Sequence, residues 1–382
     1  MANVNQIYSI VNDSASEALG KSAITAKDTG TFVSLGDQVV SSDKNKEQFY
    51  KSLTNRIGIT VIAARAYKAK KRSVKRDEME WGAIYQKVSY KWRNASQNNA
   101  WDPNAQSNPF DVEISTEAVQ KLFGVIGTYN YKDSIPDYQL FTAFTNPSAM
   151  GAFISGIYTN MYNALEVADE NLANLAVSTN IAGVLKKGKA TQKRNLLTEY
   201  KTISGDATIT VATALTNPNF IKYATREIKT VIDNMSMMST LYNVETDIPR
   251  HTPSDKAVVE VLGLFASASD TYLQSDTYHK ELVALPKYEK VVYWQGSGTS
   301  FNFEDVSKIN ITNSSIGTET VEQGGILAFV HDVDSVASII YRRRSHNLYN
   351  PDKECFNIWE KADKGFAVDL SENAVVFYIA EA

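Results

Sequence analysis

The sequence predicts an α+β fold with one unusually long helix. After Asn146-Pro147, apolar residues keep helical spacing for about seven turns, against the usual three or four. A polar and charged segment, residues 68–110, lies between short elements and is too long for an ordinary connection. Runs of β-branched and aromatic residues near the C-terminus indicate strands that close the chain.

Composition indicates an ordinary folded protein and excludes several classes. The chain has 382 residues, 43% of them apolar and 21% charged, which is enough for two domains or one elaborate domain. The net charge of −4 argues against a nucleic-acid binder by overall charge. Cys355 is the only cysteine, so an internal disulfide or a multi-cysteine zinc site is excluded. The N-terminus does not resemble a secretory signal, and no apolar run is long enough for a membrane helix.

The first 45 residues are predicted to form an extended arm with at most a short helix. They are rich in Ser, Ala, Asn, Asp and Gly, and their apolar clusters are short. Such a segment cannot bury enough surface alone to offset the entropy lost on ordering, so it would have to lie on something else. A helix is predicted next, with Asp43 as N-cap, Phe49, Leu53 and Ile57 on one face, and Gly58 at its end. A β-branched strand at residues 59–62 would follow.

Residues 68–110 are predicted to form a long protruding hairpin or flap. The segment carries a basic run, then acidic residues, then aromatic residues, and ends in a stretch dense in Asn, Gln, Ser and Pro. We interpret the charged residues as contacts to a neighbouring subunit, and these contacts would fix how the two subunits align. A solvated charged face is the second interpretation, and nucleic-acid binding by phosphate contacts is the third. The candidate contact residues are Lys70, Lys71, Arg72, Lys75, Arg76, Glu78, Trp81, Tyr85 and Trp92.

The long helix is predicted over about residues 147–180, opened by a proline in its first turn. A basic loop at residues 182–195 is expected after it, followed by a second amphipathic helix that begins at Asn217-Pro218. A strand at residues 258–262, a helix around residues 266–282 and a strand at residues 291–294 complete an α/β layer. The closing strands are predicted at residues 326–330, 336–343, 355–359, 365–369 and 374–379.

No motif makes a strong case for catalysis. Residues 183–190 (Gly-Val-Leu-Lys-Lys-Gly-Lys-Ala) match a phosphate-binding loop except at Ala190, where Ser or Thr would ligate magnesium. They also follow a helix rather than a buried strand, so a flexible basic loop is the better interpretation. The four histidines have no ligand-spaced partners, and Cys355 is expected in the core. Asp332 and Asp334 are interpreted as a turn. No cofactor, metal or catalytic residue is predicted.

The order of these parts resembles the major capsid proteins of the phi-29-like short-tailed phages, which have the HK97-type capsid fold. The resemblance begins at residues 47–58 (Glu-Gln-Phe-Tyr-Lys-Ser-Leu-Thr-Asn-Arg-Ile-Gly), and residues 80–85 resemble the returning arm of that family's extended loop. Residues 155–167 resemble the start of its spine helix. The resemblance implies these parts: N-terminal arm 1–45, P-domain start 46–66, extended loop 67–110, P-domain with the spine helix 111–205, A-domain 206–335, and closing P-domain strands 336–382.

The resemblance implies a self-assembling shell subunit that forms pentamers and hexamers around packaged double-stranded DNA. Its implied partners are further copies of the chain, a portal, a separate scaffolding protein, and DNA contacted non-specifically on the inner face, with no membrane. The implied location is the virion, after synthesis in the host cytoplasm. Two alternatives stay open. One is an encapsulin-like nanocompartment shell, and the other is a nucleotide-dependent enzyme that uses residues 183–190.

Overall fold

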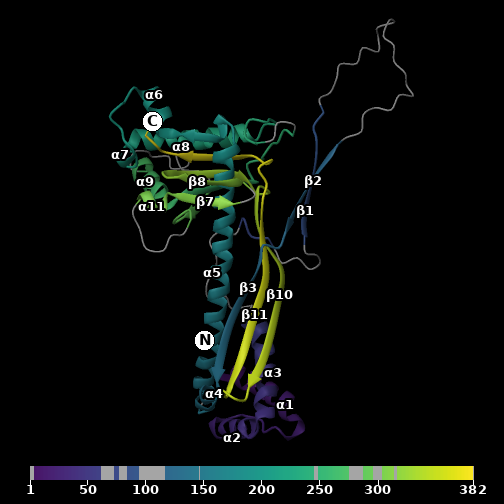
Figure 1. The fold of residues 1–382 in the computed structure, drawn as a ribbon. Helices are drawn as coiled ribbons and strands as arrows, with labels where there is room; N and C mark the ends of the chain where they lie inside the picture. Colours follow the sequence, from purple (N-terminus) through teal and green to yellow (C-terminus); the bar gives the residue numbers. More distant parts are fainter. Residues whose placement is uncertain are drawn as a thin grey trace, which may run out of the picture.

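The structure is a computed structural model that describes residues 4–61, 73–76, 84–93, 117–145, 147–244, 248–274, 287–295, 303–313 and 316–381. Figure 1 shows a long vertical helix, α5 (Pro147–Lys187), beside three long strands. N-terminal helices lie beside and below the lower end of α5, and a domain of helices and strands lies at its upper end. A two-stranded ribbon leaves the body on the side opposite that domain.

The helix α5 is confirmed, and it extends beyond the predicted residue 180 to Lys187. Its two halves belong to different hydrophobic cores. Met150 and Met161 pack into the lower core, whereas Leu172 and Val184 pack into the upper one. The predicted basic loop at residues 182–195 is therefore wrong, because its first residues continue the helix. After Gly188 and Lys189, the segment forms a short 3-10 turn, η2 (Ala190–Gln192), and a strand, β4 (Lys193–Asn195).

The N-terminal segment is helical rather than extended, which corrects the sequence-based expectation. It forms α1 (Val4–Leu19), the 3-10 turn η1 (Gly20–Ser22) and α2 (Thr29–Val40). Its apolar residues recur every four positions, and Ile7, Val11 and Ala15 are buried in the lower core. The segment does lie on something else, as predicted, but that surface belongs to its own chain.

The next helix, α3 (Asp43–Val61), is longer than predicted, and Asp43 is its first residue rather than its N-cap. Ser42 Oγ accepts a hydrogen bond from the backbone N–H of Asn45 at 3.2 Å, so Ser42 rather than Asp43 caps the helix. The helix continues through Gly58, and residues 59–61 are helical, so the predicted strand there is wrong. Ile62 lies outside the described residues.

Three long strands form an antiparallel sheet against α5. They are β3 (Gly127–Pro136), β10 (Val336–Asn350) and β11 (Cys355–Val368), in the order β10-β11-β3. The sequence divided β11 into two strands, whereas the structure has one. A short helix, α4 (Asp137–Ala143), connects β3 to the start of α5. Figure 1 shows this sheet running alongside the lower half of α5.

The upper domain is built around a five-stranded sheet in the order β4-β12-β9-β5-β6. The predicted amphipathic helix is confirmed as α8, and the apolar residues of one face are buried. The closing strand β12 pairs with β9 and β4 in this sheet and not with β10 or β11, which differs from the expected grouping of closing strands. The domain contains α6 (Leu196–Ser204), α7 (Val211–Ala214), α8 (Pro218–Met235), β5 (Ala257–Leu262), α9 (Gly263–Gln274), β6 (Glu289–Val291), α11 (Phe303–Val306), β7 (Ile309–Asn313), β8 (Gly317–Gln323), β9 (Ile326–Asp332) and β12 (Ala374–Tyr378).

Candidate functional site: the root of the ribbon

The ribbon consists of β1 (Ile84–Tyr90) and β2 (Ala118–Gly124), which pair antiparallel from Ile84↔Gly124 to Tyr90↔Ala118. Burial alternates along both strands, so the ribbon has two different faces. The inner face, which we define as Tyr85, Lys87, Ser89, Val119, Lys121 and Phe123, is partly covered. The outer face, which we define as Ile84, Gln86, Val88, Tyr90, Ala118, Gln120 and Leu122, is exposed.

Apolar contacts hold the ribbon where it joins the body. Tyr85 and Phe123 pack against a small buried cluster on the long sheet that includes Ile339 and Tyr341. The Tyr341 hydroxyl donates to the Phe123 carbonyl at 2.9 Å. Gly365 allows the backbones to cross, because a Cβ there would lie 2.7 Å from the Gly124 carbonyl oxygen. This cluster lies at the end of the ribbon nearest the body.

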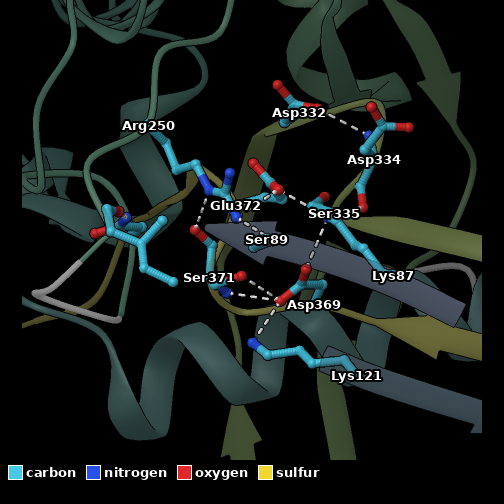
Figure 2. A network of polar contacts seen from close by, with 12 residues as sticks. Lys87, Ser89, Lys121, Arg250, Asp332, Asp334, Ser335, Asp369, Ser371 and Glu372 are labelled. Atoms are coloured by element: carbon cyan, nitrogen blue, oxygen red, sulfur yellow. Dashed lines mark hydrogen bonds and ion pairs between the residues drawn. The ribbon is translucent and has the colours of Figure 1, made fainter. Parts of the chain in front are cut away.

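An ionic cluster holds the ribbon one step farther out (Figure 2). Lys87 Nζ lies 2.7 Å from a carboxylate oxygen of Asp369 and 2.7 Å from one of Glu372. It also donates to the Asp334 carbonyl at 3.1 Å. From the paired strand, Lys121 Nζ lies 2.8 Å from the other Asp369 oxygen. We call this cluster, with Ser89, Arg250 and Ser371, the clasp.

Arg250 connects the clasp to the upper domain. Its guanidinium donates to Ser89 Oγ on the ribbon at 2.7 Å and lies 3.3 Å from Glu372. It donates to the Ser371 carbonyl at 3.4 Å. Its backbone N–H and carbonyl both pair with Ser239 in the upper domain. One arginine therefore bridges the ribbon, the turn between β11 and β12, and the upper domain.

The turn that supplies the carboxylates, residues 369–373, is itself held by hydrogen bonds. Asp369 Oδ1 accepts from the Ser371 N–H at 3.0 Å and from its hydroxyl at 2.6 Å. The Asp369 N–H donates to the Ser335 carbonyl at 2.8 Å. Because Asp369 is only 2% exposed, these donors replace most of its hydration. The carboxylate is thus fixed before any ribbon lysine reaches it.

Opposite charges shift the titration of the clasp residues in opposite directions. Burial lowers the pKa of Lys87, but the charges of Asp369 and Glu372 outweigh burial and raise it above 10.5. Burial raises the pKa of Asp369, but the Lys87 charge and hydrogen bonds from Lys121, Lys87 and Ser371 hold it well below 3.8. Both groups are therefore charged across the neutral pH range.

These shifts predict that the ion pair between Lys87 and Asp369 does not respond to pH between about pH 5 and about pH 9.5. The depressed pKa of Asp369 stabilises the fold above its ordinary pKa, and this contribution is lost only as pH falls through the lower value. The raised pKa of Lys87 stabilises the fold below 10.5, and this contribution is lost only as pH rises through the higher value. Lys87→Met should lower the free energy of unfolding by about 2 kcal/mol throughout that window.

Urea unfolding of the parent and of Lys87→Met at several pH values measures that difference. Lys91→Met is the matched control, because Lys91 pairs at 2.6 Å with Glu117, each one residue beyond its ribbon strand, and both side chains are well exposed. The control should cost well under 1 kcal/mol. If the loss of unfolding free energy caused by Lys87→Met halved between pH 6 and pH 9, the prediction of a pH-independent ion pair would be contradicted.

The structure describes four of the nine predicted contact residues and places three of them against their own chain. Lys75 Nζ lies 3.1 Å from Glu166 on α5. Arg76 donates to the Val333 carbonyl at 2.6 Å and lies 3.5 Å from Asp334. Tyr85 packs at the ribbon root, and Trp92 lies exposed beyond β1. The other five lie outside the described residues: Lys70, Lys71, Arg72, Glu78 and Trp81.

The strand order of the ribbon corrects one detail of the resemblance. Ile84 and Tyr85 belong to the outgoing strand, and the returning strand is β2, so these two residues are not part of a returning arm. Residues 80–83 lie outside the described residues. Sequence reasoning also missed the clasp residues Lys87, Lys121, Arg250, Asp369 and Glu372. β1 and β2 each contain one lysine, Lys87 and Lys121, but a single charged residue in a strand did not reveal their partners.

Residues 183–190 do not form a phosphate cradle. Gly183 lies within α5, and a Cβ there would lie 2.8 Å from Leu370. The Gly188 N–H donates to the Val184 carbonyl at 2.7 Å, and the Lys189 N–H donates to Gln192 at 3.0 Å. Lys189 Nζ donates to the Thr240 carbonyl. The backbone donors that would hold phosphate are used within the chain, so the nucleotide interpretation loses its geometric basis.

Other site types are not found in the described part of the chain. Among the residues that the structure describes, no group of three or more His, Cys, Asp or Glu side chains is placed to hold a metal ion. In that same part, no helix combines the length and apolar character needed to cross a bilayer. A hollow of about 290 Å³ is lined by residues that include Val211, Phe303 and Ile379 and by none of residues 183–190.

A spine helix backed by a long three-stranded sheet, with a second domain at its end and a projecting ribbon, defines a shell-forming capsid fold of the HK97 type. A capsid chain of Staphylococcus phage Andhra has this fold, with a TM-score of 0.51 and 10% identity over 81% of this chain and 84% of that chain. A chain from the structure of head fiber and inner core protein gp22 of native bacteriophage P68 also has a TM-score of 0.51, at 11% identity over 80% and 83%.

The chain belongs to the Phi29-like phage major capsid protein family, whose sequence model matches residues 9–378. It is 27% identical over 173 residues to the major capsid protein of Bacillus phage GA-1. That match covers 45% of this chain and 35% of the length of the relative.

Proposed function

We propose that this chain is the major capsid subunit of a tailed phage, and that its copies assemble as pentamers and hexamers into an icosahedral or prolate shell that encloses packaged DNA. Family membership and the capsid fold support the proposal. The observation that supports it most directly is the exposed apolar surface on the outer face of the ribbon. A nanocompartment shell with enzyme cargo is not better supported, because the matched family is that of phage major capsid proteins.

In the part of the chain that the structure describes, little covers the outer face of the ribbon. Ile84, Val88, Tyr90 and Leu122 are between 47% and 64% exposed. The pairing puts them side by side, since Ile84, Val88 and Tyr90 share one face of β1 with Leu122 on β2. An exposed apolar face on a projecting ribbon is typical of a surface that another molecule covers. We propose that a second copy of the chain covers it.

The predicted contacts of Lys70, Lys71, Arg72, Glu78 and Trp81 with a neighbouring copy belong to the same proposal. Trp92, exposed beyond β1, fits this role as well. Lys75, Arg76 and Tyr85 serve it indirectly, by holding the flanking segment and the ribbon to their own body. Each contact between copies is weak, and the shell gains stability because every subunit repeats it.

The remaining partners follow from the same proposal. A portal and a separate scaffolding protein would complete the shell, and DNA would touch its inner face without sequence preference. A net charge of −4 fits weak, non-specific contact with DNA rather than tight binding. The chain would be made in the host cytoplasm, reside in the virion and carry out no catalysis.

Val88→Gln combined with Leu122→Gln tests the proposed function. Each substitution keeps the side chain's approximate size but removes apolar area that would be buried between copies, a loss of about 1–2 kcal/mol at each site. We expect a folded subunit whose particle yield falls at least tenfold, because about 1.4 kcal/mol is a factor of ten in association. Sedimentation and negative-stain microscopy measure the yield under conditions where the parent forms particles.

The matched control is Gln86→Ala combined with Gln120→Ala. These residues lie on the same exposed face, so the control removes polar side chains and leaves the apolar ones intact. It should form particles within about twofold of the parent, since exposed polar groups contribute little. Parental yield from the Val88→Gln and Leu122→Gln variant would refute the role given to this face.

A further inference from the structure

The geometry points to Asp369 and Glu372 as positioning residues that fix the direction in which the ribbon leaves the body, before any neighbouring copy is bound. This inference rests on the proposed function, since the ribbon is the part that would reach a neighbour. According to this inference, contacts within one subunit determine the direction of the ribbon, and contacts between copies are not needed for it.

The apolar contacts at the root cannot fix that direction alone. Tyr85 and Phe123 are paired one position from the end of the ribbon, beside the turn that carries it onto the body. Contacts so close to the point where the ribbon joins the body prevent the ribbon from sliding, but they only weakly oppose its rotation about that point. The residues that oppose rotation must lie farther out along the strands.

The clasp residues lie farther out. Lys87 is two residues and Ser89 four residues beyond Tyr85 on the same face, or about 7 Å and about 13 Å along the strand. Lys121 is paired directly with Lys87 on the other strand. Both strands are therefore tied to the same carboxylate at the same distance from the point where the ribbon joins the body, so the ribbon cannot rotate or twist without breaking an ion pair.

The body side of the clasp is rigid enough to serve as a reference. Asp369 Oδ1 is held by Ser371, and the Asp369 backbone is held by Ser335. The turn lies between β11 of the long sheet and β12 of the five-stranded sheet, so it is attached to both parts of the body. Arg250 adds a third attachment through Ser239 in the upper domain. The direction of the ribbon is thereby set relative to both parts.

Spin-label distances in unassembled subunits test the inference. The labels are placed at Gln120→Cys on the ribbon and Ser254→Cys on the upper domain, both exposed, with Cys355→Ser to remove the native thiol. With the clasp intact, the distribution of distances between labels should be narrow. Lys87→Met combined with Lys121→Met should widen it at least twofold. Glu372→Gln, which keeps the size and removes one charge, should give an intermediate width.

The control is Lys91→Met, which makes the same chemical change on the ribbon outside the clasp and should leave the distribution narrow. An unchanged width in both Lys87→Met with Lys121→Met and Glu372→Gln would overturn the inference, because the apolar root would then suffice. Glu372→Gln provides the decisive measurement if the double variant fails to fold. The distances are measured in dilute, unassembled subunits, so failure of the shell proposal would not alter this result.

Discussion

Replacing residues 94–116 with a short Gly-Asn linker should give a folded subunit that forms no shells. The Lys91 N–H donates to the Glu117 carbonyl at 2.9 Å, so the linker would close a ribbon whose root, clasp and strand pairing are intact. The melting temperature should change by only a few degrees, because the length of the connection between two paired strands has a small effect on stability. Particle formation should be lost, since the removed residues include much of the segment 68–110 that the sequence predicts to contact a neighbouring subunit, and the outer face of β1 and β2 would keep only part of that contact. Differential scanning calorimetry and electron microscopy measure the two effects.

A Gly/Ser replacement of the same length is the control for that deletion. It keeps the length of the segment but removes its side chains. This variant should therefore also form no shells if those side chains make the contact with a neighbouring copy. The structure also shows why a larger deletion from residue 70 onward would be a poor test. Val74 and Arg76 form backbone hydrogen bonds with Ser338 of β10, and the deletion would remove these together with β1. Normal particles from the 94–116 deletion would exclude the segment from assembly.

The second large effect is expected at a buried ion pair between the spine helix and β11. Lys364 is 1% exposed and pairs with Asp169, which is 5% exposed. Asp169→Leu would leave the Lys364 ammonium buried without its carboxylate, with the Tyr129 ring, 5.2 Å away, as a weaker favourable contact. We expect the free energy of unfolding to fall by about 3–5 kcal/mol, measured by urea denaturation.

Asp169→Leu combined with Lys364→Met provides the control. It removes both charges, so no buried ion is left unpaired, and most of the lost stability should return. Arg343, which also lies near Asp169 at 3.4 Å, is partly exposed and can be hydrated instead. A double variant as unstable as Asp169→Leu would mean that packing, rather than charge, accounts for the effect.

The parts of the fold that depend on local periodicity were predictable from the sequence. Both α5 and α8 combine a proline in the first turn with an apolar face, and each begins where the sequence predicts. The N-terminal helices carried the same kind of signal in Ile7, Val11 and Ala15. Their polar composition suggested an extended arm instead. The error arose because the segment is stabilised by packing on Phe49, Phe144 and the long sheet, which composition does not reveal.

Long-range pairing accounts for what the sequence could not predict. Lys121 and Asp369 are 248 residues apart, and neither is unusual in its local sequence. β12 is recognisable as a strand, but its pairing with β9 and β4 depends on how the whole chain returns. The clasp therefore could be found only after β1, β2 and the turn at residues 369–373 had been placed in space.

The length of α5 has a mechanical consequence. Its 41 residues form a rod about 60 Å long that is embedded in a different hydrophobic core at each end. A tilt of about 5° at the N-terminal end would move the other end by about 5 Å, more than one residue step along a β-strand. Small changes in packing among α1, α2 and α3 would thus produce larger shifts in the position of the upper domain.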